Sequence, residues 1–269
     1  MSDENKSAVV GGINRGGGKV IRHNKKSQTT VLTSWDDMAA CGMSKHAVEN
    51  AYKQRFGESP DEVHLNDQFC KSYGWLSYNE MGTVKYYDVK VVPKSKIGAE
   101  RILTNETDTA YTHTVTFTNN ETDSATVTVK NSSSISMGTS IEIGLPELGM
   151  GSSFSQSFSV SNESGSSSTH STSVTIADTV EVEVPAHSKR KLSLEVKWEE
   201  RSEDFEIPVS IQSWGLTGAQ FPSRVEGHYH WGFYHSSSFQ PPFSSKLTGS
   251  LTASFNTIGQ VVIGEVEAE

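Results

Sequence analysis

The chain has 269 residues, of which 34% are hydrophobic and 20% are charged, and its formal net charge at pH 7 is −9. A chain of this length can bury a sizeable core in one or two domains. The acidic balance argues against nucleic acid as a partner and against adhesion to anionic lipid through bulk charge. No apolar run reaches the ~18 residues that a transmembrane helix needs, so we expect none.

Residues 1–30 are polar and contain a basic, glycine-rich stretch, GGINRGGGKVIRHNKKS. Its spacing does not match a phosphate-binding loop and no apolar strand precedes it, so we expect an irregular arm open to proteases. The first residues lack the apolar segment of a secretory signal peptide, so we expect no signal peptide. Cys41 and Cys70 exclude a disulfide framework and leave open either one bridge or two free thiols.

Residues 31–100 carry the helical patterns of the chain. Ser34 is placed to cap a short helix over 35–41, and Ser44 to cap a longer one over Lys45–Phe56. The stretch that follows is dense in aromatic residues and ends in the alternation typical of a strand. These aromatics form either a core or a platform for a ligand, and both alternatives stay open.

From about Ile102 onward, Asn, Thr, Ser and Val dominate, and no helix pattern recurs. Apolar and polar residues alternate with a period of two, which predicts strands with one exposed face. We predict strands at 109–118, 124–130, 171–184, 190–198, 205–212, 225–235 and 247–265. Several exceed the usual length of about five or six residues, which indicates an elongated antiparallel β-structure rather than a compact sandwich.

The stretch 132–161, SSSISMGTSIEIGLPELGMGSSFSQSFSVS, predicts an amphipathic β-hairpin, because two alternating arms flank a Gly/Pro turn. One face carries the apolar residues Ile135, Met137, Ile141, Ile143, Phe154, Phe158 and Val160. The other face carries Ser136, Ser140, Glu142, Ser153, Ser155, Ser157 and Ser159. The tip is apolar for a turn, with Leu145, Pro146, Leu148 and Met150.

This hairpin has the properties of a membrane-inserting element. Each arm of ten residues, 134–143 and 152–161, spans roughly 23 Å when tilted, close to the thickness of an outer-membrane-type hydrocarbon layer. The serine face suits a water-filled lumen and the apolar face suits lipid. One hairpin alone would leave its edge groups unpaired in lipid, so insertion requires several copies closing into a barrel. The alternative is an amphipathic strand pair of a soluble β-sandwich, whose half-buried strands alternate in the same way.

The segment HYHWGFYH, 228–235, contains His228 and His230, but no carboxylate or Cys lies at a supporting spacing, so we expect no metal site. Its aromatic side chains form either a patch for a membrane surface or glycan, or part of a sheet core. Across the chain, our candidates for contact with a ligand are Trp75, Tyr78, Tyr229, Trp231, Phe233 and Tyr234.

The run from Asn105 to Val184 resembles the aerolysin-like β-pore-forming proteins, in particular the epsilon-toxin and mosquitocidal-toxin group. The resemblance rests on the order of four features. An Asn-x-Thr element opens NETDTAYTHTVTFTNNETDSATVTV, and the Ser-rich hairpin with its Gly/Pro/Leu tip follows. The strand SGSSSTHSTSVTIADTVEVEV and the turn VPAHSK come next, and the matching positions end at Ile207.

The resemblance implies a mainly β fold, an elongated antiparallel aerolysin-like architecture with a small α+β N-terminal region. It divides the chain into a receptor-binding-type region, 1–103, which 214–243 is a candidate to complete, and a pore-forming β module, 104–269. It implies a soluble, released protein that binds an unidentified receptor (protein, glycan or lipid) on a target-cell membrane. The six aromatic candidates then become receptor-binding candidates.

The implied mechanism is assembly into a homo-oligomer and insertion of the 132–161 hairpin as a transmembrane β-barrel. Glu142 would repeat as a ring of carboxylates in the lumen, which favours cations. We expect the neighbouring Ser-rich strands to cover the apolar face in the soluble form. The basic N-terminal arm and the tail after Lys246 are the candidate regions for activating cleavage.

Two other classes of function remain. A carbohydrate- or receptor-binding β-module that never inserts is the main alternative, and the uncharged hairpin with its apolar tip argues against it. An enzyme is the second alternative. The sequence shows no paired carboxylates in a plausible cleft, no nucleophile elbow and no phosphate loop. We therefore expect neither catalytic residues nor a cofactor.

Overall fold

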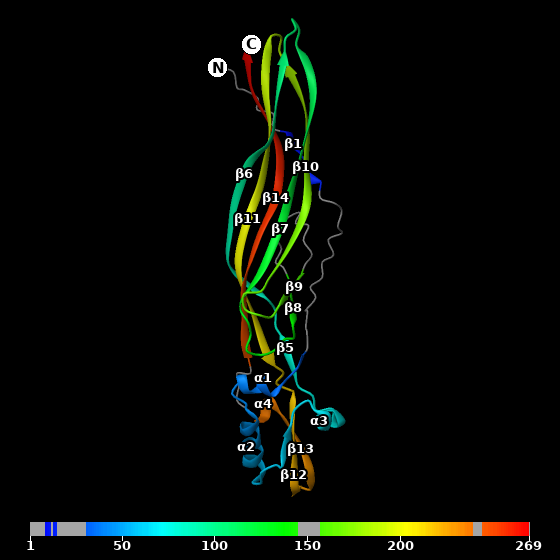
Figure 1. Cartoon of the computed structure of the whole chain (residues 1–269), viewed down its shortest axis with the longest axis vertical. Helices are drawn as coiled ribbons and strands as arrows, with labels where there is room; N and C mark the ends of the chain where they lie inside the picture. Colours follow the sequence, from blue (N-terminus) through cyan, green and yellow to red (C-terminus); the bar gives the residue numbers. More distant parts are fainter. Residues whose placement is uncertain (1–8, 12, 15–30, 145–156, 239–243, 269) are drawn as a thin grey trace.

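The structure, a computed structural model, describes residues 9–11, 13–14, 31–144, 157–238 and 244–268. The molecule is elongated, with long strands along its axis and the helices gathered at one end (Figure 1). The helices are α1 (Trp35–Ala40), α2 (Lys45–Phe56), α3 (Gln68–Tyr73) and α4 (His235–Ser238). The strands are β1 (Val9–Gly11), β2 (Ile13–Asn14), β3 (Val31–Leu32), β4 (Glu62–His64), β5 (Tyr78–Met81), β6 (Lys85–Asn105), β7 (Tyr111–Asn131), β8 (Ser140–Gly144), β9 (Ser157–Ser161), β10 (Ser167–Val184), β11 (Ser188–Ile211), β12 (Leu216–Val225), β13 (His228–Tyr234) and β14 (Ser244–Ala268).

A nine-stranded antiparallel sheet forms the body of the molecule. Its main path runs β2-β10-β7-β14-β11-β5-β3, while β6 also pairs with β11 and β1 with β14. Five of its strands have 18 residues or more, because each is paired with neighbouring strands along most of its length. The predicted mainly β, elongated architecture is confirmed.

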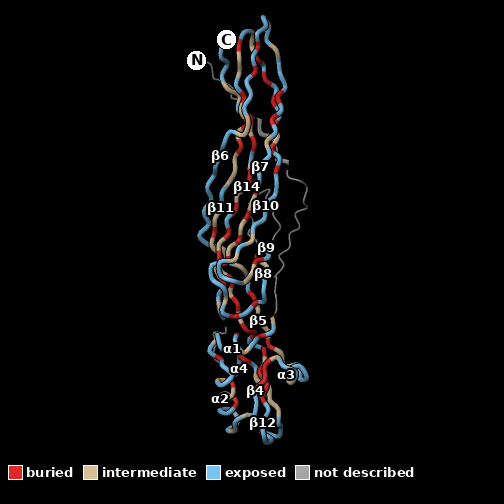
Figure 2. The backbone as a smooth tube through the Cα atoms, viewed as in Figure 1, coloured by how far each residue is buried: buried red, intermediate tan, exposed pale blue. Residues whose placement is uncertain are grey.

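Burial alternates along much of β7, β10, β11 and β14, as the period of two predicts, whereas β6 is exposed over most of its length (Figure 2). Two apolar cores result among the residues that the structure describes. One extends from the helices along β7, β11 and β14 and includes Met38, Tyr52 and Phe205. The other lies farther along the sheet and includes Ile176 and Leu192. The sheet is therefore half-buried along most of its length.

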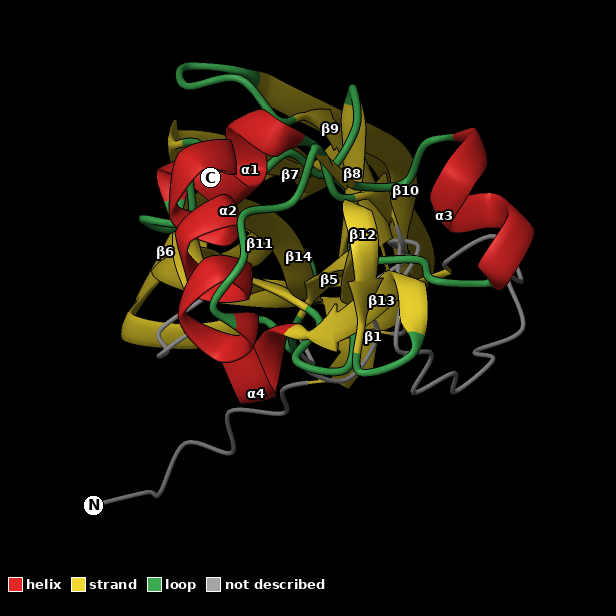
Figure 3. Ribbon diagram, turned by 90° about the horizontal axis from the view of Figure 1, so that it is seen from below, coloured by secondary structure: helices red, strands yellow, loops and turns green. Residues whose placement is uncertain are grey.

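The two predicted helices are present. The Ser34 side chain caps α1, and the Asp37 side chain accepts a hydrogen bond from the Ser34 amide in return. Ser44 caps α2, and Gly57 ends it in the left-handed conformation. Helices α3 and α4 are short and were not predicted, because each is too short to show a helical period. Viewed from below, α1, α2 and α4 lie on one side of β12 and β13, and α3 lies on the other (Figure 3).

Several predicted strands have different bounds in the structure. The predicted strands 109–118 and 124–130 are parts of one strand, β7, and 190–198 and 205–212 are parts of β11. Within a long antiparallel sheet, polar stretches remain paired on both edges, so they do not end the strand. The predicted strand 225–235 is wrong at its start, because Glu226 and Gly227 turn with positive φ between β12 and β13.

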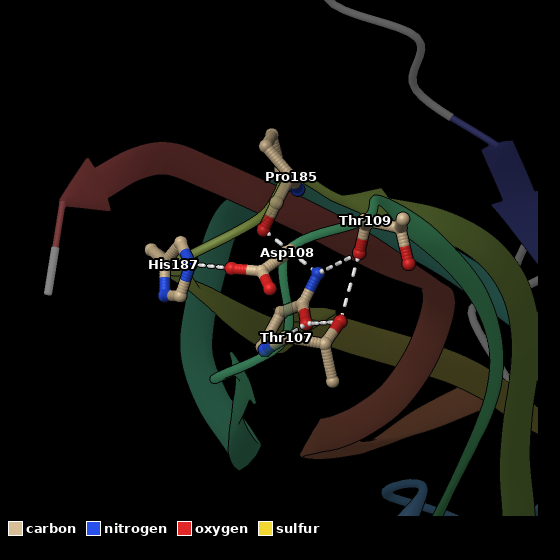
Figure 4. Close-up of polar contacts among 6 residues, drawn as sticks. Thr107, Asp108, Thr109, Pro185 and His187 are labelled. Carbon is tan, nitrogen blue, oxygen red and sulfur yellow. Dashed lines mark hydrogen bonds and ion pairs between the residues drawn. The ribbon is translucent and has the colours of Figure 1, made fainter.

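Asn105 joins the two turns at the end of the sheet opposite the helices (Figure 4). Its buried side-chain amide donates to the carbonyls of Thr109, Val184 and Pro185, each at 2.9 Å. His187, in the second turn, pairs with Asp108 at 2.8 Å. The Asn-x-Thr element and the VPAHSK turn, which carried the family resemblance, are therefore in direct contact.

The predicted boundary at 103/104 falls inside a strand of the body sheet. Strand β6 crosses it and pairs with β11 from Lys85 to Asn105. At the helical end, β12 pairs with both β13 and β4. Segments on both sides of the predicted boundary thus share one small sheet, and the division into two functional regions stays a prediction.

Candidate functional site

The predicted hairpin is present as β8 and β9, an antiparallel two-stranded sheet in which Ser140 pairs with Ser161 and Glu142 with Ser159. It is separate from the nine-stranded sheet. Ser153, Phe154, Ser155 and the tip (Leu145, Pro146, Leu148, Met150) lie outside the described residues. The prediction that the first arm is a strand from 134 onward is wrong for this form, because β8 begins only at Ser140.

The apolar face of the hairpin is buried. Its described members, each at most 3% exposed, are Ile135, Met137, Ile141, Ile143, Phe158 and Val160. They belong to one core cluster with Val127 of β7, Phe205 of β11 and Leu251 of β14. The expectation that the neighbouring Ser-rich strands cover this face agrees with the position of β9 beside β7 and β10 and with the edge-to-face contact of Phe158 with His170 of β10. The buried side chains that share the core with the hairpin are aliphatic and aromatic.

The polar face of the hairpin points the other way. Ser136, Ser140, Ser157 and Ser159 are exposed, and Glu142 is half-buried. The two faces predicted from the alternation are thus distinct in the described part of the hairpin. Their roles as lipid face and lumen face stay predictions, because they concern an inserted state.

Side chains of the body bind the main chain of the hairpin segment. The Tyr86 hydroxyl donates to the Gly144 carbonyl at 2.6 Å. The Ser134 hydroxyl donates to the Ser245 hydroxyl at 2.9 Å, and the Ser134 amide donates to it at 3.0 Å. Ser136 is held by two residues of the helical end, Asp37 and Asn79. These contacts are side-chain contacts, which can be released one at a time.

The receptor-binding candidates fall into two groups in the structure. Tyr229 and Tyr234 are exposed, at 46% and 52%. Phe233 stacks on Tyr52 at a centroid distance of 4.1 Å, and the half-buried Trp231 donates its ring N–H to a main-chain carbonyl. The latter two side chains therefore pack on the core of the helical end.

Trp75 and Tyr78 are half-buried. Trp75 stacks on Tyr73 at 4.5 Å, and the Tyr73 hydroxyl bonds His230 at 2.8 Å. Tyr73, 46% exposed, is a surface aromatic that is not among the candidates predicted from the sequence. It belongs to α3, a helix whose single turn and a half carries no periodicity from which its outer face could be predicted.

Other kinds of site find no support among the residues that the structure describes. No cluster of three or more His, Cys, Asp or Glu side chains there is suited to a metal. Cys41 and Cys70 are free thiols. Within the same residues, none of the helices has the length and apolar character needed to span a membrane.

No family model and no curated protein matches the chain. Among solved structures, it is similar to parasporin-2, a Bacillus thuringiensis toxin that recognises cancer cells, with 27% identity over 89% of this chain and 99% of that one and a TM-score of 0.56. A non-toxic crystal protein from Bacillus thuringiensis is more distant, with 11% identity, coverage of 83% and 94%, and a TM-score of 0.47. The Mpp75Aa1.1 β-pore-forming protein from Brevibacillus laterosporus shows 10% identity, coverage of 87% and 94%, and a TM-score of 0.46.

The fold and the similarity to parasporin-2 agree. The shared region covers nearly all of both chains, so the similarity extends beyond any single segment of the fold. The mainly β, elongated architecture with a small helical end is the one that the sequence resemblance implied. The chain has the aerolysin-like fold, and its similarity to parasporin-2 supports the resemblance to the aerolysin-like β-pore-forming toxins.

Proposed function

We propose that the chain is a non-enzymatic β-pore-forming toxin or defence protein, which binds a receptor on a target cell, forms a homo-oligomer and inserts the 132–161 hairpin into the membrane. The observation that carries this proposal is the separate pairing of the hairpin. Among the described strands, β8 and β9 pair only with each other. The hairpin can therefore leave the body without breaking any ladder of the nine-stranded sheet.

Burial of the apolar face supports the same proposal. Fully burying a large apolar side chain stabilises a protein by about 1.5–3 kcal/mol. The six described apolar side chains of the hairpin would all lose that burial if the hairpin were released into water. A released hairpin is therefore unstable in water and favours another apolar environment. A lipid bilayer provides one, provided that neighbouring copies pair with the open strand edges.

The position of the hairpin in the chain supports extension into one long element. It connects β7 to β10, which pair without a register shift from Val184–Tyr111 to Ser167–Thr128. Continuing that register by eight residues on each strand places Ser159 opposite Ser136. In the soluble form Ser159 pairs with Glu142, six residues further along. Because six is an even number, this change of register keeps each side chain on its own face.

The register change is the test of insertion. A disulfide between Ser136→Cys and Ser159→Cys is expected in membrane-bound oligomers but not in the soluble protein. The matched pair, Glu142→Cys with Ser159→Cys, is expected to cross-link in the soluble protein and not in the oligomer. The yield of each cross-link is measured by gel mobility, before and after incubation with receptor-bearing cells. Identical yields in both states would contradict insertion by extension of β7 and β10.

Glu142 is expected to set the ion selectivity of the pore. The polar face of the hairpin, which includes Glu142, lines the lumen in this proposal. Each copy therefore adds one carboxylate to a ring. We expect a cation-preferring channel, and Glu142→Lys should shift the reversal potential in a salt gradient toward anion preference. Ser140→Lys is the matched control for adding charge without removing the carboxylate. A Glu142→Lys channel that keeps the full cation preference would remove Glu142 from the lumen.

The structure favours the N-terminal arm as the region of activating cleavage. The tail after Lys246 is most of β14, which pairs with β11 along its length and with β7. Its removal would delete a central strand, so that earlier candidate is not supported. Strands β1 and β2 of the N-terminal arm instead pair with β14 and β10 over three and two residues. Their detachment would leave the long strands in place.

The alternative, a binding module that never inserts, shares the exposed aromatic residues of the helical end. It predicts attachment to cells without leakage of an entrapped dye, before and after proteolysis. Leakage together with the register change would exclude it. Attachment without either would favour it.

A further inference from the structure

Two side chains of the helical end hold the start of the hairpin segment. Asp37, in the first turn of α1, accepts a hydrogen bond from the Ser136 amide at 2.6 Å. Asn79, in β5, donates its side-chain amide to the Ser136 carbonyl at 2.8 Å. Both main-chain groups of Ser136 are thus held, between the fully buried Ile135 and Met137. We call this arrangement the Ser136 latch.

The Asp37 carboxylate is buried and strongly hydrogen-bonded. Besides Ser136, it accepts bonds from the amide and the hydroxyl of Ser34 and from Asn79, at 2.8–3.0 Å. Burial by itself raises the pKa of this carboxyl, but these hydrogen bonds outweigh it and hold the pKa below its usual value. Asp37 therefore stays charged near neutral pH, and its bond to Ser136 is charge-assisted.

A chain of buried hydrogen bonds connects the latch to His235. The Thr33 hydroxyl donates to Asn79 at 2.9 Å, and the Ser77 hydroxyl donates to Thr33 at 3.0 Å. Ser77 also lies 2.8 Å from Nε2 of His235. A hydroxyl has one hydrogen to donate, and Thr33 receives that of Ser77, so Nε2 must be the donor. Every donor of the chain thus points toward Asp37.

His235 connects this chain to the strand that bears the exposed Tyr229 and Tyr234. It follows β13 directly, and its amide donates to the Gly215 carbonyl. Ser77 and Gly215 face its fully buried ring, and neither carries a charge. At the Asp37 end of this series of hydrogen bonds, the titratable group that interacts electrostatically with Asp37 is the Cys41 thiol. Burial and the charge of Asp37 both raise the pKa of that thiol.

We propose that this series of hydrogen bonds is an acid-sensitive release for the hairpin. Protonation of buried His235 favours a loosened helical end in which the Ser136 latch is open. The inference rests on the proposed function, because release matters to the cell only if the hairpin then inserts. His235 is the sensor in this arrangement, and Asp37 with Asn79 is the clamp.

The direction of the pH effect follows from linkage. Burial lowers the pKa of His235 to about 4, while a solvated histidine titrates near 6.5. Above pH 6.5, His235 is neutral both when the latch is closed and when it is open, so the closed state has its full stability there. Between pH 6.5 and 4 the open state binds a proton that the closed state does not, so acid favours opening by up to about tenfold per pH unit. Asp37 is charged in both states over most of this window and adds little to the slope.

Hydrogen exchange of the Ser136 amide measures the latch directly. The protection factor of the 133–138 segment, referenced to an unstructured peptide at each pH, reports the opening equilibrium. We expect it to fall by up to about tenfold per pH unit from 6.5 to 4, starting from a plateau above 6.5. A protection factor that does not change across this range would overturn the proposal.

Variants separate the sensor from the clamp. His235→Gln keeps a side-chain N–H donor but cannot take up the proton, so its protection profile should be flat. His46→Gln, at a histidine with an 81% exposed side chain on α2, is the matched control and should keep the wild-type slope. Asp37→Asn should lower the protection at every pH while keeping the slope. A wild-type slope in His235→Gln would refute the assignment of the sensor.

The titration of His235 itself decides the question if His235→Gln does not fold. Its midpoint in the wild-type protein, followed by NMR, should lie near 4, at the pH where the loss of protection levels off. A midpoint near 6.5 would contradict the proposal.

Dye release from vesicles of receptor-bearing cell membrane is measured in parallel. It distinguishes failure of the proposed pore function from failure of the acid-sensitive latch. Acid-dependent protection without dye release would keep the latch and count against the pore. Dye release with pH-independent protection would keep the pore and remove the latch.

Discussion

A disulfide between Ser134→Cys and Ser245→Cys is expected to abolish pore formation, and reduction of the disulfide to restore it. The two hydroxyl oxygens lie 2.9 Å apart in the soluble form, so the two side chains already point toward each other, as a disulfide requires. Ser245 belongs to β14, a central strand of the body sheet. The bond would hold the first arm on the body. In the extended hairpin, Ser134 instead lies opposite Ser161, so the tether and the extension exclude each other.

Dye release from receptor-bearing cells measures this effect in the oxidised and the reduced protein. Each single cysteine variant is a control for the substitution itself, and both should release dye at the wild-type level with or without reductant. Binding to cells should be unchanged in the oxidised double variant, because the tether lies away from the exposed aromatic residues of β13. Wild-type release by the oxidised protein would rule out insertion of the first arm.

Replacement of Phe158 by alanine is expected to destabilise the soluble form by about 3–5 kcal/mol, the usual range for a buried phenylalanine. The side chain is fully buried, and its ring packs edge-to-face on His170 at 4.5 Å. For a chain of this size, that loss corresponds to a decrease of roughly 6–20 °C in the melting temperature. Thermal unfolding followed by circular dichroism measures it.

Ser159→Ala is the matched control, because Ser159 is the next residue and points to the exposed face. Its stability should stay within about 0.5 kcal/mol of the wild type. Because β8 and β9 form a separate sheet, Phe158→Ala should also speed hydrogen exchange in 157–161 more than in the paired strands β7 and β10. Equal melting temperatures for the two variants would show that the hairpin is not packed on the body.

The sequence predicted best the features that depend on neighbouring residues. Ser44 caps α2 at its predicted start, because the cap bonds an amide only three positions away. The alternation from Ile141 to Ile143 and from Phe158 to Val160 separated buried from exposed side chains correctly, because strand geometry alone determines which side chains share a face.

Predictions failed where distant segments decide the structure. The body strands β7 and β11 were each divided in two, because only pairing with other strands keeps their polar stretches extended. The first arm of the hairpin was predicted as a continuous strand, yet Ser136 bonds to Asp37, 99 positions away. That the apolar face shares one core with Val127, Phe205 and Leu251 was likewise not visible in the hairpin sequence.

The sequence by itself determined the two faces of the hairpin, the long-stranded β class and the family resemblance, since each follows from residue type and local period. The tertiary structure decided that β8 and β9 form their own sheet, that their apolar face shares a core with β7, β11 and β14, and that a chain of hydrogen bonds reaches from buried His235 to Ser136. These features join residues far apart in the chain. They depend on which segments pack together, and the period of any one segment carries no information about its partner.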